Sequence, residues 1–302
     1  MTGNRAGRLR RVAESNPTME RVARGIVGRY RSLNPVRVRP RKRFAMSYYR
    51  EKLDRIAVWA PQHTENDNFY YALTPRNRSD LSALIAVVVG STPGTIDGYL
   101  AELSHDQGLR SHITSIMKGD PALRDIQVQF GRREGWYAIV RALKPTLVVE
   151  TGVHHGVGAC VLTAALLANA AEGFPGRYVG TDINPDAGRL FVGRYAEQGR
   201  ILYGDSIASL TAIDDPIDVF INDSDHSAEY EGREYDVIAS KLAQVSVVLG
   251  DNSHVTQKLS DFAREHDRPF VFFKEEPDQH WYPGAGIGIS PSSVPIGSSR
   301  QV

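Results

Sequence analysis

The second half of the chain alternates short apolar runs with longer amphipathic stretches. Five runs have the length of buried strands: 147–150, 178–183, 200–203, 217–222 and 246–250. Helical patterns lie between or after them, at 157–171, 187–195, 235–242 and 255–266. This alternation predicts an α/β fold with a doubly wound, mostly parallel sheet. Two last runs, 269–274 and 286–290, predict a closing antiparallel hairpin.

The residues before this alternation favour helices. Ser79 and Asp80 are suited to cap a helix, and the run Gly90-Ser91-Thr92-Pro93 would end it. Thr92-Pro93 then predicts the start of a second helix, and residues 105–117 a third. Apolar residues at i, i+3, i+4 and i+7 predict an amphipathic helix over 133–143, directly before the first strand.

Charge divides the chain unevenly and suggests a domain organisation. The first 50 residues hold 14 Lys and Arg but only two acids, whereas the other residues hold 22 basic and 33 acidic side chains. We expect a basic, flexible arm at 1–45, a helical cap or auxiliary domain at 46–125 and the α/β domain at 126–302. The arm would fold back on the acidic body or contact an anionic partner such as nucleic acid, a membrane surface or an acidic glycan.

Composition narrows the setting. A hydrophobic fraction of 41% is ordinary for a globular protein, and no apolar run reaches the length of a membrane span. The single cysteine, Cys160, excludes a disulfide framework and suits a reducing compartment, so we expect a cytoplasmic protein. The oligomeric state is not fixed by the sequence, and a homo-oligomer stays open.

A glycine-rich turn follows the first strand. Glu150 ends the strand, and Gly152, Gly156 and Gly158 follow at G-x-x-x-G-x-G spacing before an apolar helix. Strand, glycine turn and helix allow backbone N–H groups to approach a ligand closely. A carboxylate at this turn suits a cationic or hydroxyl-bearing ligand better than a pyrophosphate.

The later strands also end near acids, which should share one crevice because ligands bind beyond the carboxyl ends of parallel strands. Asp182 follows the glycine loop by the spacing at which an acid binds ribose hydroxyls; the alternative is a polar turn and helix cap. Asp205 and Ser206, after the third strand, would contact an adenine edge or cap a helix.

The fourth and fifth strands are followed by Asp223-Ser-Asp225-His226 and Asp251-Asn252-Ser-His254. Asp223, Asp251 and Asn252 offer oxygen ligands on adjacent strand ends, which suits Mg²⁺ or Mn²⁺. The alternative is that strand-to-helix loops are often rich in Asp, Asn and Ser. His226 is suited to accept a proton near neutral pH, and Asp225 is the competing base.

Together these motifs resemble the class I S-adenosylmethionine-dependent methyltransferases. The pairs Asp223-x-x-His226 and Asp251-Asn252 look like those of metal-dependent O-methyltransferases of the catechol, caffeoyl-CoA and macrolide or aminocoumarin sugar types. The resemblance covers about 130–290. It implies a seven-stranded Rossmann-like sheet, cofactor binding by the glycine loop, Asp182 and the Asp205-Ser206 pair, metal binding by Asp223, Asp251 and Asn252, and a base at His226 or Asp225.

The implied reaction is in-line methyl transfer from S-adenosylmethionine to a hydroxyl, assisted by Mg²⁺ or Mn²⁺. A vicinal diol is the natural chelating acceptor, so we expect a sugar, glycan or natural-product moiety. Two other classes compete. Thr151-Gly152-x-x-x-Gly156-x-Gly158 also fits NAD(P)-dependent short-chain dehydrogenases, but the later tyrosines lack a lysine four residues on. A nucleic-acid methyltransferase would use the basic arm, but no Asn/Asp-Pro-Pro-aromatic motif occurs, so nucleic acid is not the favoured partner.

Overall fold

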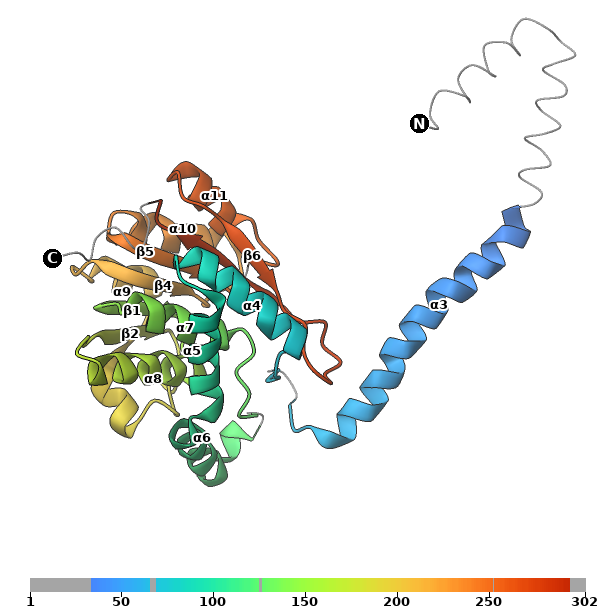
Figure 1. The fold of residues 1–302 in the computed structure, drawn as a ribbon, viewed down its shortest axis with the longest axis horizontal. Coiled ribbons are helices and arrows are strands. Elements are labelled where there is room, and N and C mark those ends of the chain that lie inside the picture. The colour runs from blue at the N-terminus through green and yellow to red at the C-terminus, as the bar shows by residue number, and fades with distance from the viewer. Residues whose placement is uncertain (1–33, 66–68, 125–126, 252, 294–302) are drawn as a thin grey trace, which may run out of the picture. The chain divides into compact units, whose positions relative to one another are not determined.

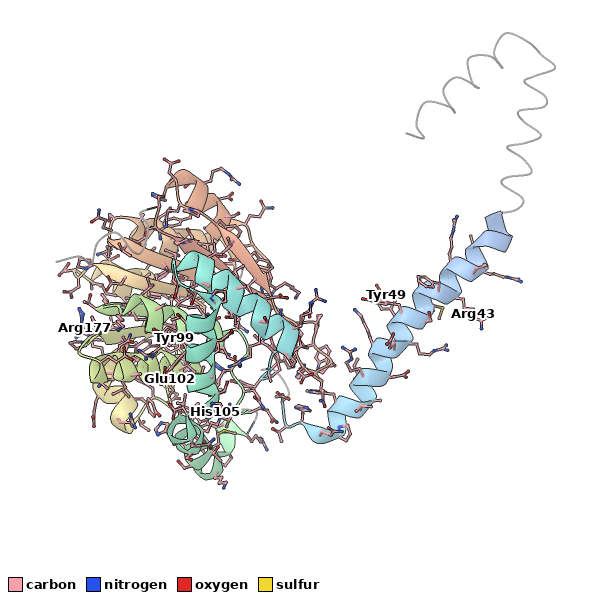
Figure 2. All side chains as sticks on the ribbon, in the orientation of Figure 1. Arg43, Tyr49, Tyr99, Glu102, His105 and Arg177 are labelled. Carbon is pink, nitrogen blue, oxygen red and sulfur yellow. The ribbon has the colours of Figure 1, made fainter. Side chains whose placement is uncertain are left out.

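The computed structural model describes residues 34–65, 69–124, 127–251 and 253–293, and the chain divides into two compact units between residues 62 and 63. The first unit contains helix α3 (Asn34–Trp59) and a 3₁₀ turn, η1 (Ala60–Gln62). Arg43 and Tyr49 project from α3 among exposed neighbours (Figure 2). Residues 1–33 of the predicted arm lie outside the described residues, whereas 34–45 are helical.

The second unit is built on a seven-stranded sheet (Figure 1). The strand order is β3-β2-β1-β4-β5-β7-β6. The strands are β1 (Leu147–Thr151), β2 (Arg177–Asp182), β3 (Gly199–Tyr203), β4 (Ile217–Asn222), β5 (Leu242–Gly250), β6 (Val271–Lys274) and β7 (Gly286–Pro291). Strands β1 to β5 are parallel, and β7 lies antiparallel between β5 and β6. The predicted Rossmann-like α/β fold with its closing hairpin is confirmed.

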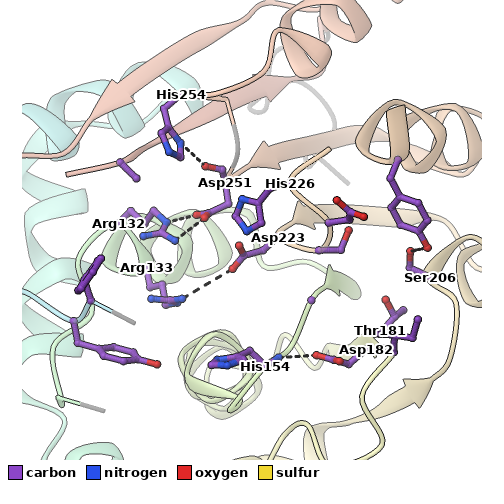
Figure 3. Close-up of a pocket in the computed structure, with 18 of the residues that line it drawn as sticks. Arg132, Arg133, His154, Thr181, Asp182, Ser206, Asp223, His226, Asp251 and His254 are labelled. Carbon is purple, nitrogen blue, oxygen red and sulfur yellow. Dashed lines mark hydrogen bonds and ion pairs between the residues drawn. The ribbon is translucent and has the colours of Figure 1, made fainter. Parts of the chain in front are cut away.

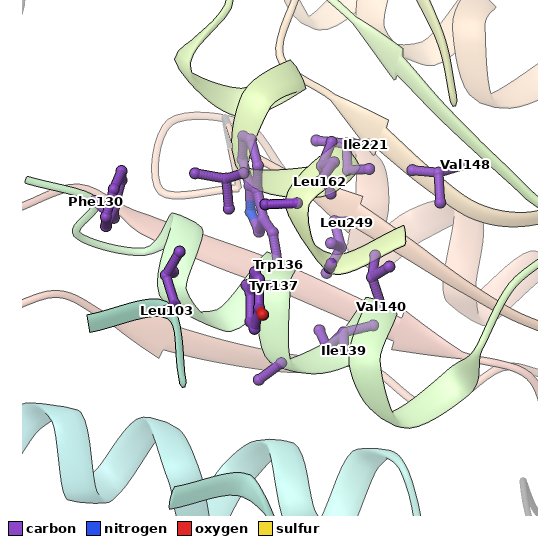
Figure 4. Packing of buried hydrophobic residues seen from close by; sticks show 14 of the residues in the cluster. Leu103, Phe130, Trp136, Tyr137, Ile139, Val140, Val148, Leu162, Ile221 and Leu249 are labelled. Carbon is purple, nitrogen blue, oxygen red and sulfur yellow. The ribbon is translucent and has the colours of Figure 1, made fainter. Parts of the chain in front are cut away.

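Neighbouring residues of a strand point to opposite faces of the sheet, and here both sets are apolar. Helices therefore cover both faces. The larger core joins one face to the helices that precede β1 and to the apolar helix after the glycine loop: α4 (Pro75–Val88), α5 (Pro93–His105), α6 (Gln107–Gly119), α7 (Arg133–Leu143) and α8 (Val157–Ala171). Figure 4 shows Trp136 of α7 near Leu162 of α8, and Ile139 of α7 and Ile221 of β4 belong to the same core. Helices α4 to α7 therefore share one core with the sheet.

The opposite face carries a second core and the helices between later strands. These are α9 (Ser206–Thr211), α10 (Ala228–Ala239) and α11 (Lys258–Glu265). Leu147 and Val149 of β1 point into this core, whereas Val148 between them belongs to the first. Strands buried on both sides read as continuous apolar runs, which is why the sequence locates them well.

Four predicted elements are corrected by the structure. The helix predicted over 235–242 ends at Ala239, and Leu242 is the first residue of β5. The helix predicted over 187–195 is wrong: within these described residues the chain runs as turns into the 3₁₀ helix η3 (Gly193–Gln198). Gly188 and Gly193 have positive φ there, which an α-helix does not accommodate. Helix α4 begins at Pro75, with Thr74 as its cap, instead of at Ser79. Helix α11 begins at Lys258 instead of residue 255.

Candidate active site

A cleft of about 760 Å³ opens at the carboxyl ends of β1, β2, β4 and β5 (Figure 3). The connections that follow these strands provide most of its wall, as expected for an open parallel sheet. The rest comes from the start of α7, the segment 69–71, the connection after β3, Tyr230 of α10, and Tyr282 and Ala285 before β7. Of the residues predicted for the site, the lining contains Gly152, Asp182, Asp205, Ser206, Asp223, Asp225, His226 and Asp251. The topology thus brings together side chains that are up to 99 residues apart, from Gly152 to Asp251.

The glycine loop is shaped by two close contacts. Gly152 has a φ of +83°, and a Cβ there would meet the backbone of Asp223 on the neighbouring strand end. Gly158 lies in the first turn of α8, where a Cβ would collide with the Glu150 carboxylate and reach 3.0 Å from the ring of Trp136. Gly156 caps α8 in the left-handed region. Both contacts require glycine, so the spacing seen in the sequence reflects packing as well as ligand access.

Glu150 lies beneath the loop instead of on the main cleft wall. It is buried and accepts a hydrogen bond from the Tyr178 hydroxyl. Burial raises the pKa of Glu150 to about 7, although the Tyr178 bond and the charge of Arg133 oppose the shift. It lines a small cavity of about 20 Å³ that shares Arg133 and Gly152 with the cleft.

Asp182 fixes the glycine loop to the end of β2. One carboxylate oxygen accepts from the backbone N–H of His154 at 2.8 Å, and the other accepts from that of Asn184 at 2.8 Å. These two bonds are those of a polar turn, which was the alternative prediction for Asp182. Its carboxylate still lines the cleft, and each oxygen has a second lone pair for a ligand hydroxyl.

Asp205 and Ser206 begin α9 at the same edge. Asp205 caps this helix by accepting from the Ala208 N–H at 3.0 Å, and it accepts from the Tyr230 hydroxyl at 3.1 Å. The cap lowers the pKa of Asp205. Ser206 donates to the buried Glu234, and both Asp205 and Ser206 line the cleft. Asp205 therefore caps α9, as the alternative prediction had it, and both Asp205 and Ser206 also line the cleft.

Asp223 and Asp251 follow β4 and β5 and lie close to two arginines (Figure 3). The Asp251 carboxylate accepts from Arg132 at both oxygens, from Nε and, at 2.6 Å, from Nη2. Asp223 lies 4.0 Å from Arg133 Nη2. Burial and then the Asp251 charge raise the pKa of Asp223. For Asp251, burial is the largest single effect and raises the pKa, but Arg132, Asp223 and Arg133 together lower it below its ordinary value. Asn252, the third predicted metal ligand, lies outside the described residues.

The two candidate bases lie together on the connection after β4. His226 and Asp225 are exposed, and both line the cleft, where Figure 3 shows the His226 ring. Asp225 accepts from the Ser227 N–H at 2.7 Å, so one of its oxygens supports the turn. Farther along, His254 Nδ1 lies 3.1 Å from the backbone carbonyl of Asp251. His226 and Asp225 both remain candidates for the base.

Arg132 and Arg133 were not predicted from the sequence, and neither were Phe69 and Tyr71, two residues of an aromatic wall. Arg133 Nε is buried and has no hydrogen-bond partner among the described residues. The wall consists of Phe69, Tyr71 and Tyr282; the Phe69 and Tyr282 rings lie 5.2 Å apart. A signal for the arginines was present: a helix followed at once by a strand runs antiparallel to it, so the start of α7 must lie near the carboxyl end of β1.

Comparison with known proteins adds a family to this geometry. The family described as "Methyltransferase domain" matches residues 149–253, from β1 to just beyond β5. This region is therefore similar to methyltransferase domains. The match confirms the resemblance to methyltransferases that the glycine loop and strand-end acids indicated. No curated protein matches the chain.

Solved methyltransferases are also similar to this chain. The O-methyltransferase TomG of Streptomyces achromogenes, in complex with SAM, has 14% identity over 63% of this chain and 91% of its own, with a TM-score of 0.47. The O-methyltransferase of Bacillus cereus has 13% identity over 72% and 99%, with a TM-score of 0.42. A caffeoyl-CoA O-methyltransferase, so described, of Staphylococcus aureus has 13% identity over 64% and 99%, with a TM-score of 0.45.

Proposed function

We propose that this methyltransferase domain transfers a methyl group from S-adenosylmethionine to a hydroxyl group of a small acceptor. The observation that carries the proposal is the continuity of the cleft. It extends from Asp182 and Asp205, which suit a nucleoside, to His226, Arg132 and an aromatic wall, which suit an acceptor. Methyl donor and acceptor must meet within one such space, because in-line displacement needs the two reacting atoms about 3 Å apart.

The described residues fit S-adenosylmethionine. Asp182 would accept from the ribose hydroxyls, and Gly152, which lines the cleft, lets the glycine loop pack closely against the Asp223 backbone beside the ligand. Arg133 presents a buried, unpaired Nε at the cavity that also contains Glu150, so the carboxylate of a bound amino-acid end would meet a guanidinium group and its amino group the Glu150 carboxyl group. When bound, the cofactor supplies a methyl group activated by its sulfonium charge.

The acceptor half combines a proton acceptor, cations and rings. His226 or Asp225 would take the hydroxyl proton, and the rings of Phe69, Tyr71 and Tyr282 would pack against an aromatic or sugar ring. A sugar, glycan or natural-product moiety with adjacent hydroxyls is the acceptor that we propose. The basic arm is proposed as a tether or a contact for an anionic partner, and a nucleic-acid acceptor is the second reading.

The divalent cation predicted from Asp223, Asp251 and Asn252 is not assigned a step. Among the described residues, no group of three His, Cys, Asp or Glu side chains is arranged to hold a metal ion. Both oxygens of Asp251 already accept hydrogen bonds from Arg132, and Asp223 faces Arg133. The described donors therefore do not fit Mg²⁺ or Mn²⁺ as they lie.

None of the described helices is long and apolar enough to cross a membrane.

Calorimetric titration tests the proposed function and its dehydrogenase alternative. S-adenosylhomocysteine should bind to the full chain with a stoichiometry of one, whereas NAD and NADP should give no binding heat. Transfer of labelled methyl from S-adenosylmethionine should then be screened over sugars, catechol-like diols and an RNA pool. NAD binding without S-adenosylhomocysteine binding would overturn the proposal in favour of the dehydrogenase.

A further inference from the structure

Arg132 sits in a network that a surface arginine would not form. Its guanidinium donates to both oxygens of Asp251, and its Nη1 lies 3.6 Å from Glu275 Oε2. Its backbone N–H donates to Glu275 Oε1 at 2.7 Å, and the Tyr71 hydroxyl donates to Glu275 Oε2 at 2.9 Å. The main chain and the side chain of Arg132 are therefore held by the same acid.

The network is buried from solvent but borders the cleft. The side chains of Arg132, Asp251 and Glu275 are 13%, 4% and 0% exposed, while Arg132 and Asp251 also line the cleft. Burying one of these charges alone would be costly, whereas a bidentate arginine–carboxylate pair satisfies both partners. Arg132 is thus a permanent part of the wall in this arrangement.

The Arg132 guanidinium therefore lies where the acids at the strand ends would otherwise attract a metal cation. Asp223 and Asp251 are the described members of the predicted metal set, and each faces an arginine. The two guanidinium groups lie against three carboxylates, those of Asp223, Asp251 and Glu275, and both would repel a dication placed between Asp223 and Asp251. Asp251 could bind it well only after Arg132 had moved away from both of its oxygens.

We propose, resting on the methyl transfer proposed above, that Arg132 is the fixed cation of the acceptor half, in the place of a divalent ion. The acceptor hydroxyl gives its proton to His226 or Asp225, and its oxygen bonds to the methyl carbon as the carbon–sulfur bond breaks. The pair of electrons stays on sulfur, which becomes a neutral thioether. Arg132 favours the negative charge that develops on the attacking oxygen, without added metal.

Manganese binding tests this assignment directly. The electron paramagnetic resonance signal of free Mn²⁺ falls when the ion binds, so it can be followed in the full chain with S-adenosylhomocysteine present. The wild-type protein should leave the signal unchanged. Arg132→Gln, and as a second variant Arg132→Met, should free the carboxylates and bind about one ion per chain. Methyl transfer by the wild type should be unchanged in EDTA.

A matched control removes an arginine from another partly buried ion pair. Arg78 donates to Glu134 at 2.5 Å, outside the cleft, so Arg78→Gln should bind no Mn²⁺. One ion bound by the wild type and lost in Asp251→Asn would overturn the proposal. Absence of binding by both Arg132 variants would also overturn it, because Arg132 would then not be what excludes the ion. Calorimetry with S-adenosylhomocysteine reports separately on the proposed function.

Discussion

At the scale of single residues, the acids that end the strands have very different surroundings. Glu150 is buried against Tyr178, Asp182 holds the glycine loop, and Asp251 is paired with Arg132. The sequence predicts their positions because each follows an apolar run. It does not predict their partners: Arg132 precedes Asp251 by 119 residues, and only the folded sheet brings them together. An acid at the end of a strand can therefore hold a loop in place, be buried as a carboxylic acid or form an ion pair, depending on its partners.

Asp182→Asn should weaken S-adenosylhomocysteine binding by roughly 10- to 100-fold, the loss expected for hydrogen bonds to a charged group. The amide provides fewer acceptor sites for both the His154 N–H and the ribose. Titration calorimetry measures the change. Asp186→Asn, the same substitution at an exposed turn position nearby, should leave the affinity unchanged. Equal affinities for wild type and Asp182→Asn would remove Asp182 from the cofactor site.

Glu150 should make stability fall with pH. Its pKa of about 7 lies above its ordinary value of 4.5, so between these values the folded protein holds a proton that the unfolded chain has released. The free energy of unfolding then decreases as pH rises through this window and levels off above it. Glu150→Gln stays neutral, so relative to wild type it should gain about 1–3 kcal/mol between pH 5 and pH 8.

Urea unfolding of the ligand-free protein at both pH values measures this difference. Glu172→Gln is the control, because its pairing with Arg141 and Lys144 lowers the pKa of Glu172 to about 2, below the window. That variant should differ from wild type by the same amount at pH 5 and pH 8. A Glu150→Gln difference that also stays constant would show that this carboxyl group titrates normally in the folded state.

At the scale of elements, the strands were easier to predict than their connections. Strands buried on both faces appear as apolar runs, and helix 133–143 was predicted with its observed bounds. The helix predicted at 187–195 is wrong because Ala187, Leu190, Phe191 and Tyr195 have helical spacing but are buried by turns and a 3₁₀ helix. Arg132 and Arg133 were missed because their helix was read only for its apolar face. Direction of a helix relative to the next strand carries information that periodicity does not.

Gly158→Ala tests how tightly α8 packs against β1. The added methyl group would collide with Glu150 and crowd Trp136, so we expect a loss of about 1–3 kcal/mol of stability and weaker cofactor binding. Thermal melting and calorimetry report the two effects. Gly98→Ala is the matched control, since Gly98 lies inside α5 with open space around its Cβ position. It should raise stability by about 0.5–1 kcal/mol; equal tolerance of both substitutions would show that α8 can shift.

At the scale of the whole molecule, the division of the chain lies between residues 62 and 63, while the sequence suggested boundaries near 45 and 125. The sequence placed the first boundary where the basic run ends, but α3 continues to Trp59. It separated 46–125 from the sheet because helices precede strands, whereas α4, α5 and α6 share the larger core with α8. Composition therefore indicates how a segment is charged, whereas the hydrophobic core shows which segments fold together. The role of 46–125 as a cap stays a prediction.

Deleting residues 1–62 should separate folding and cofactor binding from the work of the basic segment. The second unit contains both hydrophobic cores and the whole described cleft, so fragment 63–302 should melt within a few degrees of the full chain and bind S-adenosylhomocysteine with about the same affinity. Binding to a heparin column should weaken, because α3 carries Arg39, Arg41, Lys42 and Arg43 with exposed side chains. Changing these four residues to Gln in the full chain should weaken heparin binding in the same direction without altering cofactor affinity. A fragment that fails to bind S-adenosylhomocysteine although it melts cooperatively would show that the first unit completes the cofactor site.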